Sequence, residues 1–163
     1  MSVVLLRIDD RLIHGQIVTA WAKVLRAERL MAVNDKVAAD PIQKQLLTMA
    51  APGGMRTSIL SVDQAIAALT GPETAAERVM VTVKSPADAL RLIEGGVAVT
   101  GVNAGNMMFM PGKRQVTKAV SVDDQDVLAF RAIHSKGLKV EAQWLPDSAP
   151  VDLIKVVDEG GRR

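Results

Sequence analysis

The alternation of short β-rich runs with longer helical runs constrains the fold of this chain more than any other feature of its sequence. Strand patterns occur at residues 3–8, 29–33, 57–60, 78–83, 99–104, 115–120 and 138–144. Helical patterns separate most of them, and a strand, a helix and a parallel strand form the repeating unit of α/β folds. We therefore predict a three-layer α/β fold with an open, mostly parallel sheet of about six to seven strands, an antiparallel last strand at its edge, and flanking helices.

The starts of the predicted helices are marked by capping residues. Asp40 precedes Pro41, which suits the first helical position because proline lacks the N–H that would be unpaired there. Apolar residues at helical spacing then predict that Ile42, Leu46 and Met49 form the inner face of that helix. Similar caps are predicted at Ser61 with Gln64, Ser85 with Pro86, and Asp123 with Asp126. A short last helix is predicted near residues 150–157.

The composition excludes several classes of protein. The chain has 163 residues, which suits a single domain over residues 1–163, with residues 155–163 as a polar tail. A net charge of +2 and the scarcity of aromatic residues argue against nucleic-acid binding. Cysteine is absent, and no apolar run approaches the roughly 20 residues that span a bilayer. We expect a cytoplasmic protein without direct membrane insertion.

The stretch RIDDRLIHGQ, residues 7–16, lies where the first strand gives way to the first helix. In parallel sheets the carboxyl ends of the strands are the usual functional edge. His14 directly precedes the helix that Ile17 to Leu25 define, so the free N–H groups of Gly15, Gln16 and Ile17 are expected to face its ring. A helix N-terminus attracts anions and disfavours an imidazolium.

These residue types suit phosphohistidine chemistry. A neutral imidazole is a nucleophile, and the planar guanidinium of Arg11 can bind two phosphate oxygens at once. Gly15 lets the backbone approach closely, and Gln16 contributes an N–H. Asp9 or Asp10 can orient Arg11 or fix the imidazole tautomer. The stretch therefore predicts a phosphate-accepting histidine with Arg11 as its anion-binding partner.

Other interpretations of the same stretch remain open on spacing alone. A single histidine at a strand–helix junction can simply form hydrogen bonds at the helix end. Asp9, Asp10 and His14 can also form a metal site, although no cysteine or second histidine lies nearby. A pair of carboxylates acting as acid and base is a third alternative. No nucleotide-binding glycine motif is present, and no cofactor or metal is expected.

The segment LLRIDDRLIHGQIVTAW resembles the N-terminal signature of the IIB components of the mannose/fructose/sorbose class of the bacterial sugar phosphotransferase system (PTS). Further segments resemble that family in the same order, at residues 32–52, 85–97 and 102–130. The resemblance implies an open, mostly parallel sheet flanked by helices, with the histidine on its first loop. It also identifies His14 as the phosphorylated residue and Arg11 as the phosphate-binding arginine.

The resemblance further implies a phosphotransferase and its partners. His14 would take a phosphoryl group, on Nδ1, from a phosphohistidine of the IIA protein. It would then pass the group to a sugar taken up through the membrane components IIC and IID. The alternative is a regulatory phosphoprotein of the same fold, phosphorylated on His14 but not coupled to transport. A nucleotide- or sugar-binding module is a third hypothesis, which no motif supports.

Residues outside this stretch have both functional and structural interpretations. The run at Met107–Met110, with Lys113 and Arg114, is a candidate docking surface or alternatively part of the core beside two solvated cations. Asn34 and Asp35 either line the site or cap a helix. Trp21 is predicted to pack in the core, and Trp144 to point inward from the strand at residues 138–144.

Overall fold

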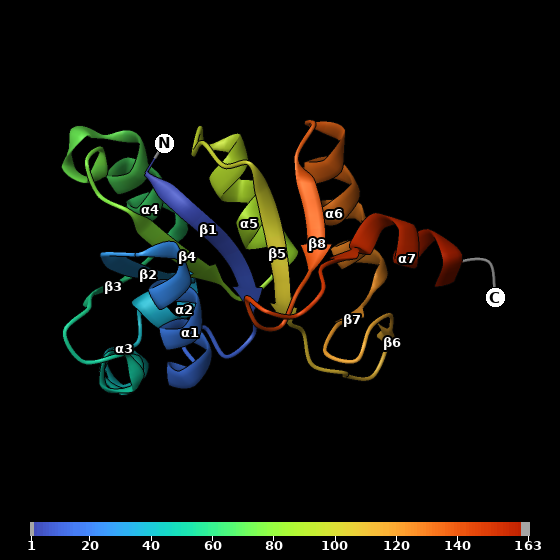
Figure 1. Cartoon of the computed structure of the whole chain (residues 1–163), viewed down its shortest axis with the longest axis horizontal. Helices are drawn as coiled ribbons and strands as arrows, with labels where there is room; N and C mark the ends of the chain where they lie inside the picture. The colour runs from blue at the N-terminus through green and yellow to red at the C-terminus, as the bar shows by residue number, and fades with distance from the viewer. Residues whose placement is uncertain (1, 161–163) are drawn as a thin grey trace.

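A central sheet positions the other elements of the computed structural model, which describes residues 2–160 (Figure 1). Its strands lie in the order β3-β2-β4-β1-β5-β8-β9. The first six in that order pair in parallel, and β9 pairs antiparallel with β8 at the edge. The strands are β1 (Val3–Asp9), β2 (Arg29–Val33), β3 (Arg56–Leu60), β4 (Val79–Val83), β5 (Gly101–Asn106), β8 (Lys139–Ala142) and β9 (Val151–Asp152). The predicted fold class is confirmed.

Helices cover the two faces of the sheet unequally. The helical segments are α1 (Gly15–Leu25), α2 (Asp35–Ala38), α3 (Pro41–Ala50), α4 (Val62–Thr70), the 3₁₀ turn η1 (Pro72–Thr74), α5 (Pro86–Glu94), α6 (Asp124–Ser135) and α7 (Leu153–Gly160). Helices α4, α5, α6 and α7 contribute to the larger core, whereas α1 and α2 contribute to a smaller core on the opposite face. Central β1 therefore has buried side chains on both faces.

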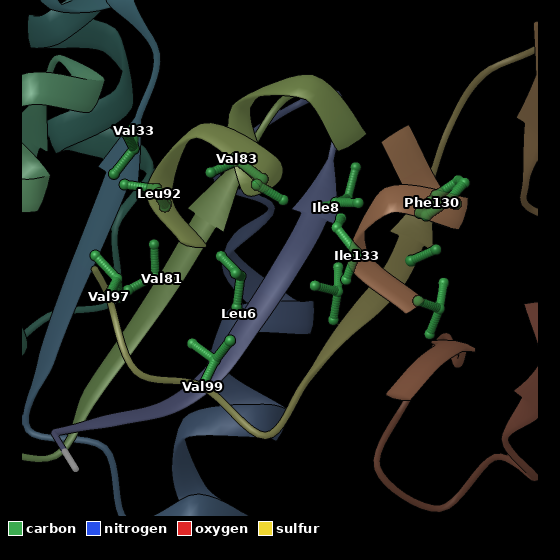
Figure 2. Packing of buried hydrophobic residues seen from close by; sticks show 14 of the residues in the cluster. Leu6, Ile8, Val33, Val81, Val83, Leu92, Val97, Val99, Phe130 and Ile133 are labelled. Carbon is green, nitrogen blue, oxygen red and sulfur yellow. The ribbon is translucent and has the colours of Figure 1, made fainter. Parts of the chain in front are cut away.

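The larger core shows how β1 is held. Leu6 and Ile8 of β1 belong to this core together with Leu92 of α5 and with Phe130 and Ile133 of α6. Figure 2 shows Ile133 beside Ile8 and Leu92 beside Val33 of β2. All of these side chains are almost completely buried. Burial of such a side chain contributes about 1.5–3 kcal/mol, so this contact fixes the strand that leads into the His14 loop.

The predicted caps form as the sequence indicates. Asp40 accepts hydrogen bonds from the N–H groups of Ile42 and Gln43. Capping boxes join Ser61 to Gln64 and Asp123 to Asp126, and Ser85 caps α5. These bonds involve residues two or three positions apart, which explains why the sequence alone reveals them.

The prediction of a buried face on α3 is wrong. Ile42, Leu46 and Met49 are 71%, 60% and 74% exposed, and α3 has no buried residue. The helix lies beside α2 and edge strand β3, with partly buried Leu47 packed against the smaller core. Helical periodicity identifies an apolar stripe but not the element that it faces.

Two further predictions differ at loops. Residues 116–119 form bends between β6 (Arg114–Gln115) and β7 (Ser121–Val122), so the strand predicted at 115–120 is instead part of a short antiparallel hairpin. Strand β8 ends at Ala142, which places Trp144 in the following loop and not on a strand. In the first place a tight turn forms, in which the N–H groups of Val116 and Thr117 donate to the Val120 carbonyl, and it overrides the local β-branched pattern.

The C-terminal segment is more helical than expected. Residues 155–160, predicted as part of a polar tail, complete α7, and Val157 packs into the larger core. The remaining tail residues, 161–163, lie outside the described part of the chain. Strand β9 also occupies two residues where the last helix was predicted to begin.

The exposure of α3 predicts a contrast between two leucines. Leu46→Ala is expected to change the free energy of unfolding by less than about 0.5 kcal/mol, because Leu46 is exposed. Leu92→Ala is expected to cost about 2–5 kcal/mol, because it leaves a cavity in the larger core. Urea unfolding of both variants measures the difference. Equal losses would show that α3 packs through Leu46.

Candidate functional site

Two apolar residues anchor the loop between β1 and α1 to the smaller core. Leu12 and Ile13 are buried in the smaller core, and Leu12 has a left-handed backbone with φ of 58°. The N–H of Leu12 donates to the Asp9 carbonyl at 2.8 Å, and the N–H of Ile13 donates to the Arg11 carbonyl at 2.7 Å. These contacts fix the backbone on both sides of Arg11 and immediately before His14.

His14 is the N-cap of α1. Its carbonyl accepts the N–H of Val18 at 3.0 Å, which leaves the N–H groups of Gly15, Gln16 and Ile17 without carbonyl acceptors inside the helix. The His14 ring is half-buried, and within residues 2–160 its Nδ1 is buried with no hydrogen-bond partner. The predicted position of His14 at the N-terminus of a helix is therefore confirmed.

Gly15 lies where the start of α1 closely approaches the end of α3. A Cβ at this position would lie 3.1 Å from the backbone carbonyl oxygen of Ala50, at the end of α3. Helix α3 thus ends beside the start of α1.

Asp9 is the carboxylate that contacts Arg11. Its Oδ1 accepts the Arg11 backbone N–H at 3.0 Å and lies 3.8 Å from Arg11 Nε. Asp9 is buried, whereas the Arg11 side chain is 42% exposed. The guanidinium carbon of Arg11 also lies 5.9 Å from the centre of the Trp144 ring, a cation–π distance. Arg11 is therefore oriented but accessible.

Asp10 has a different set of partners. Its carboxylate accepts the side-chain amide of Asn106 at 2.8 Å and the backbone N–H of Met108 at 2.6 Å. These bonds fasten the His14 loop to the end of β5. Asp10 therefore connects His14 to the segment Met108–Met110, while Asp9 orients Arg11.

Most side chains of the segment Met107–Met110, which follows β5, are exposed to solvent. Met107 is buried, but Met108, Phe109 and Met110 are 58%, 62% and 56% exposed. The docking interpretation of these three residues is favoured over the core interpretation.

Several predicted residues have structural roles. Asn34 caps α2 by accepting the Val37 N–H, and Asp35 accepts the Val62 N–H and pairs with Arg91. Lys113 is not free in solvent, because it pairs with Asp126 at 3.1 Å. Trp21 is buried in the smaller core as predicted. None of these contacts involves the His14 ring.

The metal alternative receives no support from the described residues. No group of three or more His, Cys, Asp or Glu side chains within residues 2–160 is arranged to hold a metal ion. Asp9 and Asp10 instead bind protein N–H groups and arginine.

Over the same range no helix is both long and apolar enough to cross a membrane.

Arg7 was missed by the sequence interpretation. It lies within β1, is 1% exposed, and donates to Asn103 Oδ1 at 2.8 Å and to the Gln143 carbonyl at 3.0 Å. Burial lowers the pKa of Arg7 to about 10, against the opposing effect of Asp9, so the side chain stays charged at neutral pH. The sequence feature that could have revealed it is a charged residue within an otherwise aliphatic strand.

A family comparison connects this geometry with known proteins. The model of the PTS system sorbose subfamily IIB component matches residues 3–162. The chain belongs to this family. IIB components of the PTS are phosphotransferases, so the resemblance seen in the sequence is confirmed at the level of the family.

Individual relatives agree with the family match. The chain is 41% identical over 157 residues to the fructose-specific EIIB component of Bacillus subtilis, covering 96% of each chain. It is 43% identical over 162 residues to the mannose-specific EIIAB component of Escherichia coli K12, covering 98% of this chain but only 50% of that relative. The chain thus spans half the length of the mannose-specific relatives that it matches.

Solved IIB structures share the fold. The IIBSor domain of the sorbose permease from Klebsiella pneumoniae superimposes with a TM-score of 0.93 at 39% identity, covering 98% of both chains. The strand order described here is therefore that of an experimentally determined IIB domain.

Gly105 provides a test of the geometry around Arg7. A Cβ on Gly105 would lie 2.0–2.4 Å from the guanidinium atoms of Arg7, so Gly105→Ala must displace that side chain. We expect a loss of about 1–3 kcal/mol in unfolding free energy. Gly53→Ala is the matched control, because a Cβ there meets no atom within 4 Å. Chemical denaturation of both variants measures the difference, and equal stabilities would contradict the position of Arg7.

Proposed function

We propose that this IIB chain carries a phosphoryl group on His14 between the phosphohistidine of a IIA protein and a sugar taken up through the membrane components IIC and IID. The observation that carries the proposal is His14 at the N-cap of α1, with the accessible guanidinium of Arg11 on the same anchored loop. The proposed site of action is the cytoplasm.

The proposed transfer is a pair of displacements at phosphorus. A lone pair of the neutral His14 imidazole attacks the phosphorus of the donor phosphohistidine, and the P–N bond to the donor breaks with its electron pair returning to the donor ring. In the second step a sugar hydroxyl attacks, the P–N bond to His14 breaks, and the hydroxyl proton is released. Both steps need in-line placement and stabilisation of negative charge more than acid–base catalysis.

Arg11 and the start of α1 supply that stabilisation. The N–H groups of Gly15, Gln16 and Ile17 have no helical acceptor and can donate to phosphoryl oxygens. Arg11 can turn its guanidinium toward the same oxygens because it is only held by Asp9 and Trp144 on an exposed loop. This moderate stabilisation suits a carrier, which must release the group as readily as it accepts it.

The orientation of the His14 ring limits which nitrogen accepts the group. The family resemblance implies Nδ1, and Nδ1 is buried in the described structure. A phosphoryl group on Nδ1 therefore requires the imidazole to rotate about its side-chain bonds. Rotation brings Nδ1 toward solvent and leaves the backbone of the loop, which Leu12 and Ile13 anchor, in place.

The donor protein is proposed to dock on apolar residues around His14. A specific interface covers about 800 Å² of each partner, so a protein that reaches His14 also covers its surroundings. Asp10 holds the exposed segment Met108–Met110 beside the loop, and α3 ends beside Gly15. Flexible methionine side chains suit a surface that meets more than one partner in turn.

Phosphoryl acceptance by two histidine variants tests whether His14 is the residue that carries the phosphoryl group. The purified chain is incubated with labelled phosphoenolpyruvate, the general phosphotransferase proteins and a charged IIA protein. His14→Ala is expected to abolish an acid-labile, base-stable adduct. His134→Ala removes the other histidine, an exposed residue near the end of α6, and is expected to retain the adduct. An adduct that survives His14→Ala would overturn the assignment.

Arg11→Lys tests the role of the guanidinium. Lysine keeps the charge but loses the two-point contact with phosphate oxygens. The variant is expected to accept phosphoryl groups while passing them to sugar at least about tenfold more slowly, which corresponds to about 1.4 kcal/mol. Coupled sugar phosphorylation by reconstituted membranes is the measurement. A sugar-transfer rate equal to that of the unmodified chain would argue against Arg11.

Phe109→Ala tests the docking surface. Loss of this exposed aromatic is expected to raise the KM for phosphorylated IIA about tenfold with little change in kcat, because the contact serves binding and not chemistry. Leu128→Ala on α6 is the matched control, since Leu128 is 60% exposed but lies outside the His14 loop and the segment after β5. Equal KM values for the two variants would exclude Phe109 from the interface.

A further inference from the structure

The buried arginine of β1 has contacts that core packing alone does not require. Arg7 donates from Nη1 to Asn103 and to the carbonyl of Gln143, so it connects β1, β5 and the end of β8. Among residues 2–160 its Nη2 is buried without a hydrogen-bond partner. That nitrogen lies 3.8 Å from Asp9 Oδ2.

Burial of this cation is costly for the fold. An apolar side chain of similar volume would avoid the desolvation of a guanidinium, and replacing buried ion pairs by apolar groups is often neutral or stabilising. The site also restricts its neighbour, because Gly105 cannot carry a Cβ without meeting the guanidinium. An arginine at this position therefore indicates a role beyond stability.

Asp9 links Arg7 to the arginine of the functional loop. Its two oxygens face two different cations, with Oδ2 toward Arg7 Nη2 and Oδ1 toward Arg11 Nε, each at 3.8 Å. Asp9 and Arg7 are buried, whereas Arg11 is accessible. Of the two cations, only Arg11 is free to leave Asp9 without opening the core.

A second set of contacts closes a ring through the two tryptophans. The guanidinium carbon of Arg7 lies 5.8 Å from the Trp21 ring, and Trp21 Nε1 donates to the Trp144 carbonyl at 3.1 Å. The Trp144 ring in turn lies 5.9 Å from the Arg11 guanidinium. Arg11 thus lies between Asp9 and Trp144. Arg7 lies beside Asp9 directly and is connected to Trp144 through Trp21.

We propose that Arg7 is a positioning residue that keeps Asp9 compensated while Arg11 moves between Asp9 and the phosphoryl group on His14. When a phosphoryl dianion arrives, Arg11 turns toward it, and Asp9 becomes a buried carboxylate that Arg11 no longer neutralises. Arg7 Nη2, unpartnered and close by, then donates to Asp9. When the phosphoryl group leaves, Arg11 returns. The inference rests on the proposed function, in which Arg11 binds the phosphoryl group.

Removal of the Arg7 charge should slow phosphoryl acceptance through Asp9. In Arg7→Met, Arg11 is the only cation left beside a buried carboxylate and is retained there. Phosphoryl acceptance is expected to fall at least about tenfold in kcat with an unchanged KM for phosphorylated IIA.

The double variant Arg7→Met/Asp9→Asn separates positioning from packing. Without the carboxylate charge Arg11 is free again, so acceptance is expected to recover to within a few-fold of the unmodified chain. A role in packing alone would not be rescued by Asp9→Asn. Failure of the double variant to exceed Arg7→Met, with both variants folded by circular dichroism, would overturn the proposal.

The unmodified chain provides a measurement that does not depend on folding of a variant. Phosphorylation of the chain is expected to shift the side-chain ¹⁵N–¹H signals of Arg7 as well as those of Arg11, and to slow exchange of the Arg7 Nη protons as they bond to Asp9. Unshifted Arg7 signals in a chain that does carry phosphoryl groups would refute the role of Arg7. Absence of any phosphoryl adduct would instead refute the proposed function.

Discussion

The conformation of the His14 loop depends on one buried carboxylate, Asp9. Its side chain accepts the backbone N–H of Arg11, and its main-chain carbonyl accepts the N–H of Leu12. These bonds turn the chain from β1 toward α1, so that Leu12 and Ile13 enter the smaller core and His14 begins the helix. The same carboxylate faces Arg7 on the buried side and Arg11 on the exposed side. Asp9 therefore determines both the backbone conformation of the loop and the balance of charge at the site.

A site on an exposed loop, such as that of His14, suits a phosphoryl carrier better than an enclosed catalytic pocket would. A carrier must present its histidine to two partners in turn, so the site has to be shallow and its electrostatic stabilisation moderate. The apolar residues of the loop, Leu12 and Ile13, are buried in the smaller core, while Arg11 and the apolar side chains of the segment after β5 face outward. An anchored backbone and an accessible guanidinium are compatible because different residues provide them: Leu12 and Ile13 are buried, whereas Arg11 is exposed.

The fold class and the local helix caps could be predicted from the sequence, whereas side-chain contacts between distant segments could not. Caps such as Asp40 and Ser61 act within three residues, and the placement of His14 before α1 follows from the start of a helical pattern. The exposure of Ile42 on α3 depends on where the sheet ends, which no periodicity records. Arg7 appeared only as a cation in an aliphatic strand, because its partners Asn103 and Gln143 lie far along the chain. The position of Trp144 beside Arg11 likewise depends on the loop after β8.

Phosphorylation of His14 is tested most directly by the histidine ¹⁵N resonances of the phosphorylated chain. The chain is labelled with ¹⁵N-histidine and recorded before and after phosphorylation by the general phosphotransferase proteins and a IIA protein. The ring nitrogens of His14 are expected to shift and to show coupling to phosphorus, while those of His134 are expected not to change. Phosphorus coupling at His134, or an unchanged His14 in a chain that contains bound phosphate, would contradict phosphorylation of His14.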